Sequence, residues 1–155
     1  MRAAIITVSD TRTLGDDISG DKLVELVLGF SGDMVERAIV TDDSQRIADK
    51  LIAMCEGEVD VIFTTGGTGF SPRDNTPEAT RTVIEREAPG LAEAMRRETA
   101  AKHPMAMLSR GVCGIRGKTL IINLPGSPRG VEECFAVIKD VLPHAVELIR
   151  GNTEH

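Results

Sequence analysis

Short apolar runs alternate with amphipathic segments along most of the chain, and each kind of segment predicts a different element. A continuous apolar run such as Ala3–Val8 is typical of a strand that is covered on both faces. The run that begins at Val59 is rich in β-branched residues and ends in two threonines, which also indicates a buried strand. On these grounds we expect strands at Ala3–Val8, Met34–Val40, Val59–Thr65, Val112–Ile115 and Thr119–Leu124.

Helices are predicted between these runs, where apolar residues recur at helical spacing. In the first, Leu23, Leu26, Val27 and Phe30 recur at i, i+3, i+4 and i+7, and Ser19 is the expected N-cap. Later in the chain, threonine or serine followed by proline marks a helix start, because proline suits the first helical turn. The further helices are expected around Ile47–Cys55, from Thr76 as N-cap, across Leu91–Lys102, and from Ser127 to Gly151 with a kink at Pro143.

The alternation of strands and helices predicts the fold class. A strand, a helix and a second strand form a crossover unit, so we expect a parallel sheet with helices on both faces. At 155 residues the chain is long enough for one domain with a sizeable core. We therefore expect a single α/β domain over residues 1–151 and a short C-terminal tail at 152–155.

Composition and charge exclude several classes of partner. A net charge of -6 opposes binding to a nucleic-acid backbone, which needs a concentrated positive field. Four phenylalanines without tryptophan or tyrosine make a poor stacking platform for single strands. The three cysteines are far apart, which argues against disulfides and structural zinc. Neither a signal peptide nor a membrane-spanning run is recognisable, so we expect a cytoplasmic protein without a nucleic-acid or membrane partner.

The polar loops after the predicted strands carry the candidate chemistry. In parallel α/β sheets, ligands bind beside the carboxyl ends of the strands, where these loops meet. The loop after the third strand contains Gly66, Gly67 and Gly69, and glycine lets successive N–H groups turn toward an anion. The same edge of the sheet is expected to gather Asp10, Asp42 and Asp74 from three separate loops.

Each of these signals also has a purely structural interpretation. The glycine loop matches neither the dinucleotide-binding G-x-G-x-x-G nor the Walker A pattern, so a tight turn explains it as well as a phosphate cradle does. Asp42 and Asp74 suit turns before helices, but two carboxylates beside a phosphate loop favour Mg²⁺. Arg73 and Arg110 are either solvated or phosphate-binding, and Ser109 taken alone is an ordinary loop hydroxyl.

No arrangement of side chains supplies an enzymatic nucleophile. His103, His144 and His155 lack ligand spacing and are given no role, while Cys113 and Cys134 fall in apolar patterns typical of a core. Neither a Ser-His-Asp nor a Cys-His arrangement is recognisable. An enzyme built on this chain must therefore take its nucleophile from a substrate.

Several longer motifs stand in a recognisable order, which extends to about Gly151. They join the glycine loop and the candidate aspartates to segments near both ends of the chain. The motifs are VSDT at 8–11, D-x-S-G at 17–20, TTGGTGFSPRDNTPEAT at 64–80, ERE-x-PG at 85–90, AMLSR at 106–110, GIRG at 114–117 and LIINLPGSP at 120–128.

In this order the motifs resemble the molybdopterin adenylyltransferase family, that is, MogA- and MoaB-type bacterial proteins and the G domains of gephyrin and its plant counterpart. The resemblance implies a three-layer α/β/α domain with a mostly parallel sheet, assembled as a homotrimer. It also implies a reaction with Mg²⁺ and ATP, in which the terminal phosphate of molybdopterin attacks the α-phosphorus of ATP and pyrophosphate leaves. A partner of the MoeA type, a molybdate insertase, then receives the product.

The resemblance also assigns roles to residues of this chain. Asp42 and Asp74 match the essential aspartates of the family, which implies catalysis and Mg²⁺ binding. One position departs from the pattern, because many relatives have valine where this chain has Asn75. The remaining assignments are phosphate binding by Gly66, Gly67, Thr68, Gly69, Pro125, Gly126 and Ser127, and molybdopterin binding by Ser9, Asp10, Thr99, Ser109 and Arg110.

Two other functions stay open on the sequence. A non-catalytic pterin-binding or assembly module of the same fold would share these motifs, but it would have no need of the carboxylate pair Asp42 and Asp74. A nucleotide-binding α/β protein of unrelated chemistry would not explain why the motifs occur together and in order.

Overall fold

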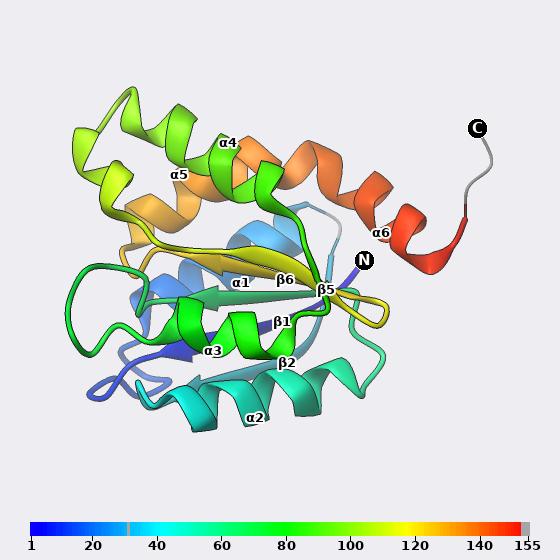
Figure 1. Ribbon diagram of the computed structural model, residues 1–155, viewed down its shortest axis with the longest axis horizontal. Coiled ribbons are helices and arrows are strands. Elements are labelled where there is room, and N and C mark those ends of the chain that lie inside the picture. Colours follow the sequence, from blue (N-terminus) through cyan, green and yellow to red (C-terminus); the bar gives the residue numbers. More distant parts are fainter. Residues whose placement is uncertain (31, 153–155) are drawn as a thin grey trace.

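In a computed structural model, which describes residues 1–30 and 32–152, six strands form one sheet in the order β2-β1-β3-β6-β5-β4 (Figure 1). β1 pairs with β2 and β3, and β3 pairs with β6, all in parallel, whereas β5 runs antiparallel to both of its neighbours. The sheet is mostly parallel, as predicted. The strands are β1 (Arg2–Val8), β2 (Asp33–Val40), β3 (Val61–Thr65), β4 (Arg86–Glu87), β5 (Cys113–Arg116) and β6 (Thr119–Leu124).

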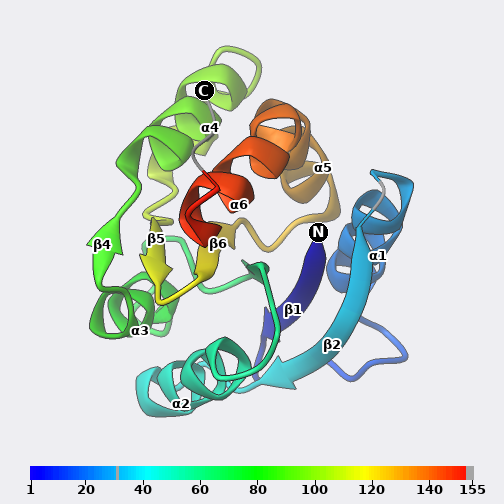
Figure 2. The same ribbon diagram turned by 90° about the vertical axis from the view of Figure 1, so that its right-hand side faces the viewer.

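Helices cover both faces of the sheet, and Figure 2 shows the resulting three layers end-on. On one face lie α2 (Ser44–Cys55) and α3 (Thr76–Val83), and on the other lie α1 (Ile18–Gly29), α4 (Pro89–Ala100), α5 (Pro128–Ile138) and α6 (Leu142–Arg150). Two short 3₁₀ helices, η1 (Pro104–Leu108) and η2 (Lys139–Val141), follow α4 and α5. This arrangement confirms the predicted three-layer α/β/α domain.

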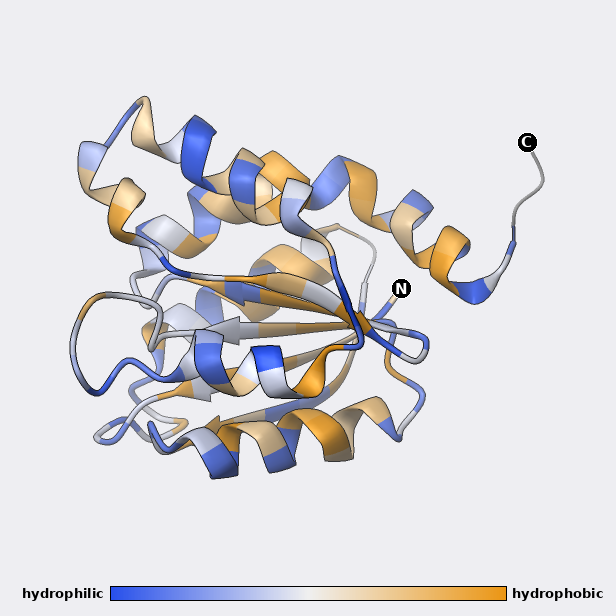
Figure 3. Cartoon of the chain, in the orientation of Figure 1, coloured by the Kyte–Doolittle hydropathy of each residue, from blue (hydrophilic) through white to orange (hydrophobic). Residues whose placement is uncertain are grey.

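The core consists of two apolar layers, one on each face of the sheet. Because side chains alternate along a strand, Ile5 packs with Leu23 and Phe135 in one layer, and Ile6 packs with Leu51 in the other. All four of the aliphatic residues named here have no solvent-exposed surface. Figure 3 shows the matching bands of apolar and polar residues on the helices. Burial on both faces explains why β1, β3 and β6 are continuous apolar runs in the sequence.

Two helix starts differ from the prediction. α1 is capped by Asp17, and the predicted cap Ser19 lies within the helix. α3 follows Asn75, and the predicted cap Thr76 is its first residue. In both cases the hydroxyl instead donates to a backbone carbonyl: Ser19 to Gly126 after β6, and Thr76 to Gly66 at the start of the loop between β3 and α3. The predicted cap at Ser127 is confirmed, because its side chain accepts the N–H of the residue three positions later.

Most other element bounds lie within a few residues of their predicted positions; the helix expected at Leu91–Lys102, for example, spans Pro89–Ala100. The helix expected from Ser127 to Gly151 is divided by η2 into α5 and α6, and β4 was not predicted. Over residues 1–30 and 32–152, no helix combines the length and hydropathy needed to span a bilayer. The tail predicted at 152–155 falls, after residue 152, outside the described residues.

Candidate active site at the carboxyl ends of the strands

A cavity of about 530 Å³ opens where β3 and β6 end, between α4 and α5. This volume lies in the range of about 300–1,000 Å³ that is usual for small-molecule sites. Two backbone segments form one wall, and side chains from α4, η1 and α5 form the others. The lining includes Gly67, Thr68, Gly69, Asp74, Met95, Arg96, Thr99, His103, Ser109, Asn123, Pro125, Gly126, Ser127, Arg129 and Glu133.

The glycine loop of residues 66–69 has all four of its carbonyls engaged by donors outside the loop. The carbonyls of Gly66 and Gly67 accept the hydroxyl and the backbone N–H of Thr76, at 2.9 and 3.1 Å. The carbonyls of Thr68 and Gly69 accept the backbone N–H and Nε of Arg110, at 2.8 and 2.7 Å. In the described part of the chain, the N–H groups of residues 67–69 have no such partner. The loop therefore offers N–H groups to a ligand, as expected of an anion cradle.

Glycine is required at the start of this loop. Gly66 and Gly67 have φ angles of +96° and +65°, in the left-handed region that other residues rarely adopt. A Cβ on Gly66 would lie 2.5 Å from the carbonyl oxygen of Val8, and one on Gly67 would lie 2.4 Å from Oγ1 of Thr76. The tight turn thus explains why glycine is required here, and the same backbone leaves the N–H groups of residues 67–69 available to an anion.

The turn after β6 is held in the same way and touches the glycine loop. The carbonyl of Pro125 accepts Oγ1 of Thr65 at 2.8 Å, and that of Gly126 accepts Oγ of Ser19 at 2.6 Å. A Cβ on Gly126 would lie 3.3 Å from Cα of Gly66, so the two segments are in close contact. α5 begins directly after this turn and adds the positive end of its dipole to the cavity.

Asp42 and Asp74 flank the glycine loop, which confirms that the winding of the chain brings them to one edge of the sheet. Oδ2 of Asp42 lies 3.2 Å from the position that a Cβ on Gly67 would take. Oδ2 of Asp74 lies 2.8 Å from the corresponding position on Gly69. The third predicted member, Asp10, joins them because its Oδ1 accepts the backbone N–H of Asp42 at 2.9 Å.

Crowding of the three carboxylates has an electrostatic consequence. The pKa of Asp42 is raised mainly by burial; the N–H of Asn75 opposes the rise, and the charges of Asp74 and Asp10 add to it. The pKa of Asp10 is lowered by the N–H from Asp42 and by its ion pair with Arg73. Asp42 is therefore the carboxylate that would gain most from a cation at this edge.

The carboxylates fit a magnesium ion that takes part of its coordination from a substrate. One oxygen of each is held by the chain: Oδ1 of Asp42 accepts the N–H of Asn75 at 3.1 Å, and Oδ2 of Asp74 accepts that of Ser71 at 2.9 Å. The other oxygen of each carboxylate accepts no hydrogen bond from residues 1–30 or 32–152. These residues also contain no group of three or more metal-ligating side chains. Mg²⁺ typically binds one or two carboxylates together with phosphate oxygens and water, so the pair is sufficient.

The residues predicted to bind molybdopterin divide into two groups. Ser109 and Thr99 line the cavity, although Oγ1 of Thr99 already donates to the carbonyl of Met95 at 2.6 Å. Ser9, Asp10 and Arg110 are not among the lining residues. Oγ of Ser9 accepts N–H groups of its own loop, and the Arg110 guanidinium is bound to backbone carbonyls and to Glu78.

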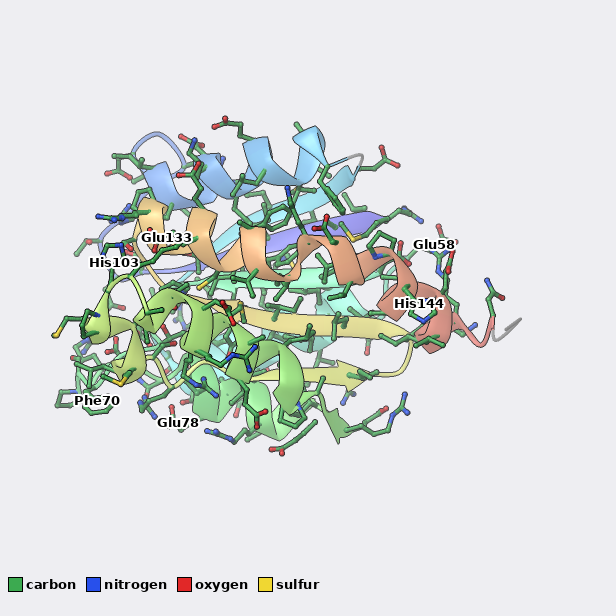
Figure 4. The ribbon with its side chains drawn as sticks, turned by 90° about the horizontal axis from the view of Figure 1, so that it is seen from above. Glu58, Phe70, Glu78, His103, Glu133 and His144 are labelled. Carbon is green, nitrogen blue, oxygen red and sulfur yellow. The ribbon has the colours of Figure 1, made fainter. Side chains whose placement is uncertain are left out.

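One cluster in the cavity has no counterpart in the sequence predictions. His103, to which the sequence gave no role, faces Glu133 across the gap between α4 and α5 (Figure 4), with Nε2 3.1 Å from Oε1. Nε of Arg129 lies 3.0 Å from the same oxygen. In the sequence, only the i, i+4 spacing of Arg129 and Glu133 indicated part of this cluster, because His103 lies outside α5, between α4 and η1.

The chain was compared with known proteins. A family model described as "Probable molybdopterin binding domain" matches residues 4–144. The molybdopterin adenylyltransferase of Helicobacter pylori is 40% identical over 153 residues, which is 96% of this chain and 87% of that protein. The molybdenum cofactor synthesis protein cinnamon of Drosophila melanogaster is 46% identical over 149 residues. That match takes in 94% of this chain but only 25% of the fly protein, so the chain spans a quarter of it.

Solved structures agree over nearly the whole chain. The molybdopterin biosynthesis enzyme MoaB from Thermus thermophilus superimposes with a TM-score of 0.90 at 46% identity, covering 97% of this chain and 96% of that one. The tungsten cofactor synthesizing protein MoaB from Pyrococcus furiosus gives a TM-score of 0.86 at 30% identity, with 96% of each chain covered. With the family model, these matches show that the chain belongs to the molybdopterin-binding domain family of molybdenum cofactor biosynthesis proteins.

Proposed function

We propose that this chain adenylylates molybdopterin with ATP and Mg²⁺, giving adenylyl-molybdopterin and pyrophosphate. The observation that carries the proposal is the placement of Asp42 and Asp74 on either side of a loop whose carbonyls are all engaged elsewhere. That arrangement suits a metal-bound polyphosphate. The name of the relative from Helicobacter pylori, molybdopterin adenylyltransferase, supports the same reaction.

The chemistry requires little from the protein beyond positioning and neutralisation. An oxygen of the terminal phosphate of molybdopterin forms a bond to the α-phosphorus of ATP, and the bond from that phosphorus to the oxygen bridging it to the β-phosphorus breaks. Pyrophosphate carries away the electron pair of the broken bond. Both reactants are anions, so holding them in line and neutralising their charge lowers the barrier. This explains why no side chain need act as nucleophile.

Each part of the cavity has a task in this proposal. The N–H groups of residues 67–69 and the start of α5 bind phosphate oxygens. Asp42 and Asp74 hold Mg²⁺, which supplies positive charge to the phosphate oxygens as the leaving group departs. Ser109 offers a hydroxyl among the residues that line the cavity, and we place molybdopterin beside it. Thr99 can only accept a hydrogen bond there, because its own proton is already donated.

We further propose that the protein works as a homotrimer in the cytoplasm and passes its product to a MoeA-type molybdate insertase. The trimer and the transfer of the product rest on the family resemblance. Multi-angle light scattering of the purified protein tests the first, and a mass other than that of three chains would remove it. Transfer of adenylyl-molybdopterin to a purified insertase, followed through molybdate insertion, tests the second.

The reaction itself is tested by incubating the protein with molybdopterin, ATP and Mg²⁺ and separating the products by chromatography with mass detection. We expect one adenylyl-molybdopterin and one pyrophosphate per turnover, with neither formed when Mg²⁺ is chelated. ATP carrying a methylene group between its α- and β-phosphorus should bind without turnover. Molybdopterin binding without any product would instead assign the chain to the non-catalytic pterin-binding modules.

A further inference from the structure

The side chain of Arg110 closes the base of the loop that carries Asp74. Its Nε donates to the carbonyl of Gly69 at 2.7 Å, and its Nη2 donates to the carbonyl of Asp74 at 2.8 Å. A single guanidinium therefore joins the first and last residues of the 69–74 segment. The backbone N–H of Arg110 also donates to the carbonyl of Thr68 at 2.8 Å.

These contacts restrict the orientation of the Asp74 carboxylate. Arg110 fixes the backbone of Asp74 from one side, and the N–H of Ser71 fixes its Oδ2 from the other. The remaining oxygen, Oδ1, is then directed by a backbone and a side-chain torsion that are both held. A carboxylate that is preorganised in this way loses little conformational entropy when it binds a cation.

Glu78, in the first turn of α3, holds the guanidinium in place. Its carboxylate forms an ion pair with Nη1 of Arg110, and the hydrogen bond from Arg110 lowers the pKa of Glu78, which keeps the pair charged. The two side chains are 48% and 32% exposed, and exposed pairs of this kind contribute only about 0–1 kcal/mol to stability. The pair therefore matters less for folding than for orienting the fork of Arg110 onto two carbonyls.

We propose that Arg110 and Glu78 are positioning residues for the metal-dependent step, acting through the orientation of Asp74. This proposal rests on the proposed function, because it needs Asp74 as a ligand of the Mg²⁺–ATP complex. It replaces the direct contact with molybdopterin that the family resemblance implied for Arg110. The guanidinium is bound to Gly69, Asp74 and Glu78; Arg110 does not line the cavity of about 530 Å³ but lines an adjoining one of about 310 Å³, which shares Ser109 with it.

The expected size of the effect follows from other metal sites. Residues that orient a ligand without touching the metal typically cost about 10–100-fold in metal affinity or activity when they are replaced. Arg110→Lys keeps the positive charge but loses the planar guanidinium, so its single ammonium group cannot bridge the carbonyls of Gly69 and Asp74. Glu78→Gln keeps the size of the side chain and removes the charge that holds the fork.

The test is direct measurement of Mn²⁺ uptake in the presence of ATP by electron paramagnetic resonance, on the wild type, Arg110→Lys and Glu78→Gln. We expect the dissociation constant for Mn²⁺ to rise about tenfold or more in both variants. The unfolding midpoint and the KM for molybdopterin of Glu78→Gln should stay at wild-type values. Glu98→Gln is the matched control, because Glu98 forms an exposed pair with Arg97 on α4.

Two results would overturn the proposal. Unchanged Mn²⁺ affinity in Arg110→Lys and Glu78→Gln would show that Asp74 does not depend on them, and a rise confined to the KM for molybdopterin would return Arg110 to direct ligand contact. A wild type that takes up no Mn²⁺ with ATP would overturn the metal role of Asp74 as well, which distinguishes failure of the proposed function from failure of this inference.

Discussion

Asn75 donates two hydrogen bonds to Asp42: its backbone N–H to Oδ1 at 3.1 Å, and its Nδ2 to the backbone carbonyl at 3.3 Å. The contact ties the loop after β2 to the start of α3, next to Asp74. It is one reason why two aspartates from distant parts of the chain face the same glycine loop. Because the first bond uses the backbone, a valine at position 75 would keep it and lose the side-chain bonds to the carbonyls of Asp42 and Arg73.

Asn75→Val should therefore leave the metal site nearly intact. Each lost hydrogen bond of this kind changes stability by about 0.5–1.5 kcal/mol, and the loss of two is expected to lower the free energy of unfolding by about 1–3 kcal/mol. The Mg²⁺ concentration for half-maximal activity should be unchanged. Urea unfolding and a Mg²⁺ titration check both values, and a large loss of Mg²⁺ affinity would show that the side-chain bond orients Asp42.

Asp42→Asn should stabilise the metal-free protein at neutral pH while it abolishes activity. A carboxyl whose pKa is raised on folding weakens the folded state once it ionises, and this cost disappears below the unfolded pKa of about 3.9. The variant should therefore unfold at higher urea than the wild type at pH 7 and at equal urea near pH 3. A variant that is equally destabilised at both pH values would contradict this account of the crowded carboxylates.

Gly67→Ala should disrupt the anion cradle. Alanine at φ +65° is strained, and its Cβ would press on Oγ1 of Thr76, so we expect unfolding to become easier by about 1–3 kcal/mol and ATP binding to weaken. Gly29→Ala is the matched control, since a Cβ there meets nothing within 4 Å. Thermal unfolding and ATP titration compare the two. Equal behaviour of both variants would mean that the loop backbone is not specifically required.

Ser109→Ala should impair the use of molybdopterin and not that of ATP. Ser109 lines the cavity, and loss of one hydrogen bond of about 1.4 kcal/mol corresponds to about a tenfold rise in KM. Ser44→Ala, at the exposed start of α2, serves as control. Steady-state kinetics with each substrate varied in turn gives the comparison. A rise in the KM for ATP alone would place the two substrates the other way round.

Asp17 should account for part of the loss of stability in acid. Burial raises the pKa of its carboxyl, but bonds from Thr7, Arg37 and Gly20 together outweigh burial and leave the pKa lowered. A lowered pKa stabilises the fold above the unfolded value of about 3.9, and the contribution is lost as pH falls through the folded value. Asp17→Asn should flatten the decrease in urea midpoint below about pH 4. An unchanged slope would assign that decrease to other carboxyls.

Asp17→Ala tests the same contact at neutral pH. The carboxylate is fully buried, and its removal leaves the Thr7 hydroxyl, the Gly20 N–H and Nη2 of Arg37 without their acceptor, while Asp21 still pairs with Nη1 of Arg37. We expect the free energy of unfolding to fall by about 3 kcal/mol, the upper end of the cost of leaving buried donors unsatisfied. A decrease no larger than that of an exposed pair would show that water replaces the missing carboxylate.

The layers and the position of the site follow from features that are local in the sequence. Continuous apolar runs predict the buried strands, helical spacing predicts the covering helices, and strand order brings Asp42 and Asp74 together. The predicted caps Ser19 and Thr76 were wrong because each hydroxyl donates to a backbone carbonyl outside its own helix: Ser19 to Gly126, at the other end of the sequence, and Thr76 to Gly66, in the loop that leads into α3. Local pattern cannot reveal such a competitor, since it depends on which loops the fold brings together.

The same limit applies to the cavity wall. His103 and Glu133 lie thirty positions apart and meet only because α4 and α5 pack side by side. The orientation of Arg110 is also a tertiary result, as its two acceptors belong to the loop before α3. The sequence therefore predicted which residue types gather at the edge of the sheet, but not which of them face the cavity.

Asp74→Asn gives the most direct test of the central claim, that a carboxylate beside the glycine loop makes pyrophosphate release depend on Mg²⁺. Asparagine can still accept the N–H of Ser71, so the fold should persist, with circular dichroism and unfolding midpoint at wild-type values. Pyrophosphate release from ATP with saturating molybdopterin should fall by about 100-fold or more. Release at the wild-type rate by a folded Asp74→Asn protein would contradict the account.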